Sequence, residues 1–131
     1  MKYKICVIGL GYVGLPLAIA FAEKFDVIGL DINKNRIEEL KNGFDKTLEI
    51  DSSVMLSAKD KLIFTSDIQA TIDCNVYIIT VPTPIDQMNQ PNLQPLIDSS
   101  RAVGSVLKKN DIVIYESTVY PGVTEEVCVA E

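Results

Sequence analysis

The residues best suited to chemistry in this chain are three glycines near the N-terminus and an acidic residue that follows them. Gly9, Gly11 and Gly14 have the spacing G-x-G-x-x-G, and Asp31 comes twenty residues after Gly11. Between a strand and a helix, such glycines allow a tight turn, the approach of a pyrophosphate to the backbone, and close packing of the helix on the strand. The helix N-terminus then offers N–H groups and a partial positive charge to the phosphates. The pattern therefore predicts a dinucleotide site, although the glycines alone also fit a simple glycine-rich turn.

The charges around this motif indicate which dinucleotide it would take. No basic residue lies between Lys4 and Lys24, so the backbone must bind the phosphates. A carboxylate at Asp31 can bind a ribose 2′-hydroxyl and would repel a 2′-phosphate, which favours NAD over NADP. Arg36 leaves two interpretations open: a cation that serves a phosphate, or a solvated helix charge near Glu39.

Three polar residues follow the ends of two further apolar segments. Thr83 and Thr118 stand just beyond expected strands, where ligands bind in open α/β sheets, so both are candidates for the nicotinamide end of the site. Serine and threonine beside proline are also ordinary turn residues. Glu116 is a possible acid or base, and a surface carboxylate is its alternative interpretation.

Apolar segments alternate with helical patterns along the whole chain. We expect strands over residues 4–8, 26–30, 62–65, 76–80 and 112–115, and helices over about 13–24, 33–41, 66–71, 95–109 and from near 123. Residues 44–60 are expected to form a loop with a short helix. Such alternation implies βαβ units and a parallel sheet with helices on both faces.

The fold class is therefore α/β, a doubly wound parallel sheet of the Rossmann type. Residues 1–131 are expected to form one dinucleotide-binding domain. A six-strand Rossmann sheet would need one more strand, so we expect a fragment of a longer enzyme, truncated before its last strand.

The uncharged segment 5–22 has a second interpretation. It follows Lys2 and Lys4 and ends in A-F-A, as a secretory signal peptide would. Inside an apolar helix, however, each glycine costs about 1 kcal/mol and Pro16 about 3 kcal/mol. In the strand–turn–helix interpretation Pro16 lies in the first helical turn, where proline is tolerated. We therefore favour the strand–turn–helix interpretation over the signal peptide.

Composition excludes several other classes of function. Twelve basic and eighteen acidic residues give a net charge of −6, so neither nucleic acid nor an anionic membrane is an expected partner. The chain has no histidine, and Cys6, Cys74 and Cys128 form no C-x-x-C pair, so no metal site or disulfide framework is predicted. Scattered cysteines that act as small apolar packing residues are typical of a cytoplasmic protein.

Three segments resemble the N-terminal NAD-binding domain of the UDP-glucose/GDP-mannose dehydrogenase family. They are K-I-C-V-I-G-L-G-Y-V-G-L-P at 4–16, V-P-T-P at 81–84 and E-S-T-V-Y-P-G at 116–122. The last segment, with Tyr115 before it and T-E-E at 124–126, is similar to the branch that oxidises UDP-N-acetylhexosamines. Asn92 departs from the aspartate that relatives often carry, and we expect little consequence.

The resemblance implies a two-step oxidation of the sugar C6 alcohol to a carboxylate, with two NAD per sugar and a thioester on a catalytic cysteine, in the supply of surface polysaccharide precursors. It assigns the following residues to NAD: Gly9, Gly11, Tyr12, Val13, Gly14, Asp31, Arg36, Thr83 and Thr118. Thr118 would also act in catalysis by holding the catalytic water. The catalytic cysteine and the UDP-sugar contacts would lie in later segments, so the chain alone should be inactive, and the full-length protein is expected to be a homo-oligomer.

Two other functions remain open at this point. One is another NAD-dependent dehydrogenase, of the 3-hydroxyacid or 6-phosphogluconate type. The E-S-T-V-Y-P-G segment is evidence against this class. The other is a non-catalytic NAD-sensing regulatory domain, because fold alone does not determine function.

Overall fold

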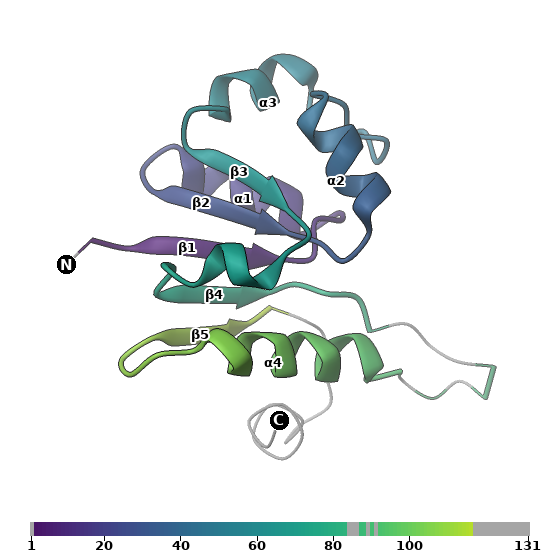
Figure 1. Cartoon of the computed structure of the whole chain (residues 1–131). Coiled ribbons are helices and arrows are strands. Elements are labelled where there is room, and N and C mark those ends of the chain that lie inside the picture. The colour runs from purple at the N-terminus through teal and green to yellow at the C-terminus, as the bar shows by residue number, and fades with distance from the viewer. Residues whose placement is uncertain (1, 84–86, 89, 91, 117–131) are drawn as a thin grey trace.

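The computed structural model describes residues 2–83, 87–88, 90 and 92–116, and it arranges five parallel strands in one sheet (Figure 1). The strands are β1 (Lys4–Ile8), β2 (Asp26–Leu30), β3 (Leu62–Thr65), β4 (Val76–Ile79) and β5 (Ile112–Tyr115). The helices are α1 (Gly14–Ala22), α2 (Lys34–Lys41), α3 (Ser52–Ala58), the short 3₁₀ helix η1 (Ile68–Thr71) and α4 (Gln94–Val106). The strand order is β3-β2-β1-β4-β5, which confirms the predicted doubly wound α/β fold.

The sheet separates two apolar cores because side chains alternate between its faces. In β1, Ile5 and Val7 pack with α1, α2 and α3 on one face. Cys6 and Ile8 pack with η1 and α4 on the other (Figure 1). A central strand covered on both faces must be apolar throughout, and this accounts for the continuous apolar segment that the sequence carries there.

The register brings the functional segments to one edge of the sheet. Ile8 pairs with Leu30 on one side and with Ile79 on the other. The glycine turn, Asp31 and the segment after β4 therefore all follow strand ends at this edge. The strand order reverses beside β1, and such a reversal is where open α/β sheets bind ligands.

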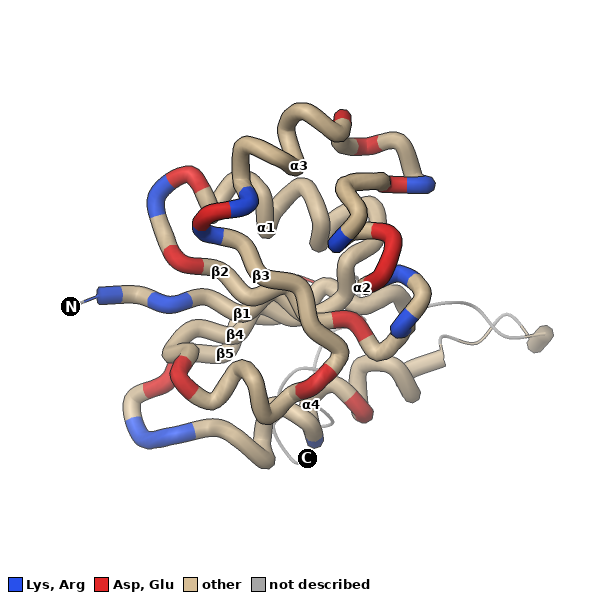
Figure 2. The backbone as a smooth tube through the Cα atoms, turned by 45° about the horizontal axis from the view of Figure 1, so that its top comes forward, with Lys and Arg blue, Asp and Glu red and all other residues tan. Residues whose placement is uncertain are grey.

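Charged residues cluster outside this apolar centre. In the tube view, Lys, Arg, Asp and Glu concentrate on helices and on the turns that join the elements, while the middle of the sheet is almost free of them (Figure 2). None of the described helices has the length and apolar character needed to span a membrane.

Several element ends differ from the predicted ones. α1 begins at Gly14 and ends at Ala22, and α4 ends at Val106 because the next residue takes an extended conformation. The short helix expected within residues 44–60 is α3, which buries Met55. The helix expected near residue 123 lies outside the described residues.

Candidate functional site

The turn between β1 and α1 needs glycine at its first position. Gly9 has φ +91°, in the left-handed region that favours glycine, and its N–H donates to the Leu30 carbonyl at 2.8 Å. A Cβ at this position would also lie 3.1 Å from both the N and the Cα atoms of Val81. The turn is therefore held closely between β2 and the segment that follows β4.

The third glycine allows α1 to contact the turn directly. A Cβ on Gly14 would overlap the carbonyl oxygen of Gly9 and the Oγ1 atom of Thr80. The Thr80 hydroxyl lies 2.8 Å from the Ile8 carbonyl oxygen and 2.7 Å from that of Gly9, so it can donate to either. The apolar pattern places Thr80 at the end of a strand and gives no indication of this contact.

The middle glycine faces open space. A Cβ on Gly11 would have no heavy atom within 4 Å, and the neighbouring Tyr12 and Val13 side chains are exposed. Among the described residues, no side chain caps the N-terminus of α1, and its first turn carries no acidic residue. Uncapped N–H groups beside an open approach are what a pyrophosphate requires, so the residues fit the phosphates of a dinucleotide.

Asp31 is fixed beside this turn. Its Oδ2 atom accepts a hydrogen bond from the Leu10 N–H at 2.9 Å, and its Oδ1 atom accepts one from the Asn33 N–H at 2.9 Å. The side chain is half-buried at the end of β2. Each carboxylate oxygen retains acceptor capacity, and this suits the two hydroxyls of a ribose.

Arg36 is buried, not solvated, with 4% of its surface exposed. Its Nε atom donates to the Leu10 carbonyl at 2.8 Å, and its Nη1 atom lies 2.6 Å from Glu39 and 2.9 Å from Asp45. Its Nη2 atom is buried without an acceptor in the described part of the chain. Burial alone would lower the pKa of the guanidinium, but the hydrogen bonds to Glu39 and Asp45 and their charges raise that pKa, so Arg36 is a cation.

Asp45 is the carboxylate that the sequence analysis missed. It is 3% exposed and accepts hydrogen bonds from Arg36, from the N–H and hydroxyl of Thr47, and from the N–H groups of Glu49 and Ile50. Burial opposes the charge, but the hydrogen bonds from Thr47 and Arg36 lower the pKa of Asp45 below its usual value. The D-K-T sequence is a pattern in which aspartate commonly accepts from the backbone two residues on, and this local signal could have indicated Asp45.

The other candidates follow the neighbouring strands at the same edge of the sheet. Thr83 is half-buried in the segment after β4, and Glu116 is exposed after β5, where its N–H donates to the Ile79 carbonyl at 2.9 Å. Thr118 lies outside the described residues. The structure therefore brings Thr83 to the edge that carries the glycine turn.

The described cysteines are packing residues. Cys6 and Cys74 are both fully buried. Burial raises the pKa of the Cys6 thiol far above its usual range and that of Cys74 to about 11. Neither thiol is suited to act as a nucleophile. Cys128 lies outside the described residues.

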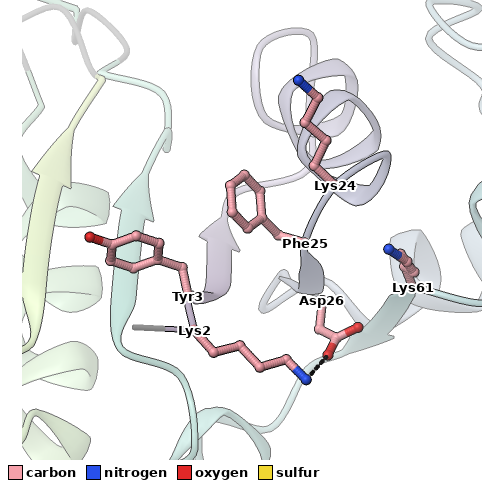
Figure 3. A pocket seen from close by; sticks show the side chains of 6 residues that line it. All are labelled: Lys2, Tyr3, Lys24, Phe25, Asp26 and Lys61. Carbon is pink, nitrogen blue, oxygen red and sulfur yellow. Dashed lines mark ion pairs between the residues drawn. The ribbon is translucent and has the colours of Figure 1, made fainter.

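A hollow lies at the opposite end of β1 and β2 from the glycine turn (Figure 3). Its lining residues are Lys2, Tyr3, Lys24, Phe25, Asp26 and Lys61. The Lys2 ammonium lies 3.9 Å from Asp26, and the rings of Tyr3 and Phe25 meet edge to face at 6.4 Å. This hollow contains none of the predicted site residues.

The parallel sheet, the glycine turn and the acidic end of β2 together define a dinucleotide-binding Rossmann domain. The family model described as "UDP-glucose/GDP-mannose dehydrogenase family, NAD binding domain" matches residues 3–131, and the chain belongs to this family. Its cofactor is accordingly NAD, as predicted.

The chain is similar to several bacterial and archaeal proteins, among them named dehydrogenases. It is 58% identical over 126 residues to UDP-N-acetyl-D-glucosamine 6-dehydrogenase from Pseudomonas aeruginosa, with 96% of this chain and 30% of that protein covered. It is 49% identical over 129 residues to Protein CapL from Staphylococcus aureus, with 98% and 30% covered. Among solved structures, the UDP-D-ManNAc dehydrogenase from Pyrococcus horikoshii superposes with a TM-score of 0.90 at 36% identity, with 95% and 30% covered. The chain thus spans about 30% of the length of these relatives.

Proposed function

We propose that this chain is the NAD-binding part of an enzyme that oxidises the C6 alcohol of a UDP-N-acetylhexosamine to a carboxylate, with two NAD per sugar. The observation that carries the proposal is the open approach to Gly11 at the uncapped N-terminus of α1, beside the Asp31 carboxylate. The substrate class comes from the relatives, among which UDP-N-acetyl-D-glucosamine 6-dehydrogenase is 58% identical.

Each residue that the resemblance assigns to NAD has a role in this proposal. The backbone around Gly9, Gly11, Tyr12, Val13 and Gly14 would hold the pyrophosphate, and Asp31 would accept from the ribose hydroxyls. Bound NAD would supply the hydride acceptor.

The remaining predicted residues would have supporting roles. Arg36 would support the adenosine end through its hydrogen bond to the Leu10 carbonyl, and Thr83 would line the nicotinamide end. Thr118 would hold the catalytic water. The role of Thr83 follows from its position after β4, and the role of Thr118 is carried over from the family resemblance.

The nucleophile of this reaction would lie elsewhere in the protein. Cys6 and Cys74 are buried in the sheet core with raised thiol pKa values, so neither is suited to form a thioester. Because the family resemblance places the catalytic cysteine in later segments, we expect the chain alone to bind NAD without oxidising a UDP-sugar. We also propose that further domains bind the UDP-sugar, and that the whole protein is a cytoplasmic homo-oligomer that supplies precursors of surface polysaccharide and binds no nucleic acid.

The decisive experiment counts NADH formed per UDP-N-acetylglucosamine consumed by the whole protein. NADH is followed by its absorbance and the sugar by chromatography, with UDP-glucose as the control substrate. A ratio of two supports oxidation to the acid, and a ratio of one would indicate a simple alcohol dehydrogenase. No turnover together with intact NAD binding would favour the NAD-sensing domain instead.

A further inference from the structure

Leu10 is held from both sides by groups of opposite charge. Its N–H donates to Asp31 at 2.9 Å, and its carbonyl accepts from Arg36 Nε at 2.8 Å. The carboxylate assigned to the ribose and the guanidinium of Arg36 are therefore neighbours across a single residue. A phosphate on the ribose 2′-oxygen, as in NADP, would be subject to both charges.

Two carboxylates already oppose the charge of Arg36, although its Nη2 atom has no acceptor among the described residues. Its Nη1 atom lies within 3 Å of two carboxylates, at 2.6 Å from Glu39 and 2.9 Å from Asp45. The side chains of Arg36, Glu39 and Asp45 are only 5%, 19% and 0% exposed, so water and salt screen their charges weakly. One cation and two anions leave this buried cluster with a net charge of −1.

Asp45 cannot turn away from the arginine. Besides the bond to Arg36, it accepts two hydrogen bonds from Thr47 and one each from the N–H groups of Glu49 and Ile50. These donors belong to the loop that follows α2, so the folding of that loop places the carboxylate against Arg36. The guanidinium is thereby kept on its protein acceptors.

We propose that Asp45, together with Glu39, determines cofactor specificity by neutralising Arg36, so that the site rejects NADP by a second means besides the carboxylate of Asp31. This inference rests on the proposed dinucleotide site. Asp45 is a positioning residue in this scheme, because it acts through Arg36 and does not touch the cofactor.

The test compares the affinities of NAD and NADP for four forms of the whole protein, by calorimetric titration at low ionic strength. Glu39→Gln keeps an acceptor for Arg36 and removes one charge. Asp45→Asn removes the other charge, and Glu38→Gln is the matched control, since Glu38 is the exposed neighbour of Glu39 on α2. We expect the preference for NAD over NADP to fall about three- to tenfold in the first two variants and to stay within about twofold in the control.

The outcomes separate the inference from the site on which it rests. An unchanged NAD-to-NADP preference in Glu39→Gln overturns the specificity role, because this variant keeps the hydrogen bond and loses only the charge. If Asp45→Asn does not fold, Glu39→Gln decides alone. Equal losses of both affinities in Asp45→Asn, with no change in preference, would reduce Asp45 to a structural residue. A wild-type protein that binds neither dinucleotide would instead overturn the proposed site, and the wild-type titration alone shows this.

Discussion

Replacing Gly14 with alanine tests how closely α1 approaches the glycine turn. The added Cβ would overlap the carbonyl oxygen of Gly9 and lie 2.8 Å from its carbonyl carbon. The turn cannot give way by itself, because Gly9 is anchored to Leu30 by a hydrogen bond of 2.8 Å. The first turn of α1 must therefore lift from the sheet and loosen its packing through Leu15, which is fully buried.

The loss of stability in Gly14→Ala depends on the atoms that the new methyl group contacts. Overpacking a core costs about 1–3 kcal/mol. Gly14→Ala should lie at the upper end of this range, because the new Cβ overlaps backbone atoms of Gly9, which cannot rotate away. Alanine recovers up to about 1 kcal/mol of helix propensity, so the net loss of unfolding free energy should be about 2–3 kcal/mol. For a domain of this size the unfolding temperature should fall by about 6–10 °C.

Urea and thermal unfolding of the chain, followed by circular dichroism at 222 nm, measure this loss. Gly11→Ala is the matched control, because its Cβ meets nothing within 4 Å and its φ is not in the left-handed region. We expect that variant to be as stable as wild type, or up to about 1 kcal/mol more stable, and to lose NAD affinity at least about tenfold. An unfolding temperature for Gly14→Ala within about 2 °C of wild type would refute the close approach.

Three further predictions concern the residues around the site and the core. Thr80→Val removes the hydroxyl beside the glycine turn and should lower the unfolding free energy in urea by about 1 kcal/mol; equal midpoints would contradict the hydrogen bond. Because the pKa of Asp45 is lowered by folding, its contribution is present above the unfolded value of about 3.9 and is lost as the pH falls through the folded value. The difference in unfolding free energy between wild type and Asp45→Asn, measured in urea, should therefore decrease below about pH 4. A constant difference from about pH 7 to pH 3 would argue against the ion pair between Arg36 and Asp45. In a Cys128→Ser variant, Cys6 and Cys74 should fail to react with a disulfide reagent at pH 8 until denaturant is added, so rapid labelling of the native protein would show that the sheet core is open.

The strands were predictable because each is a short apolar segment between charged or turn-forming residues. Four of the five have the predicted bounds, and β4 ends one residue early, at Ile79. The main-chain N–H of the next residue, Thr80, still donates to Ile8 at 2.8 Å, so the apolar pattern located the pairing correctly. The roles of Gly9 and Gly14 also followed from spacing, since both depend on local backbone geometry.

The contacts that the sequence does not predict join residues outside any short sequence window. The burial of Arg36 requires the carbonyl of Leu10 and the carboxylate of Asp45, and no local pattern joins these positions. Residues 44–60 have no helical or strand periodicity, so the D-K-T pattern could have indicated a local turn at Asp45 but not its contact with Arg36. The contact between Thr80 and Gly9 spans 71 residues, and periodicity within a short window gives no information on it.

The contact between Thr80 and Gly9 also determines when the growing chain forms its dinucleotide site during synthesis. The glycine motif is among the first parts of the chain to be made, yet Thr80 and Val81 form the wall against which Gly9 is held. Domains generally fold as units while synthesis proceeds from the N-terminus, and pairings between distant segments form late. A nascent chain that ends before β4 would carry the complete motif without its binding geometry, so cofactor capture should begin only after the fourth strand has been made and has docked beside the first.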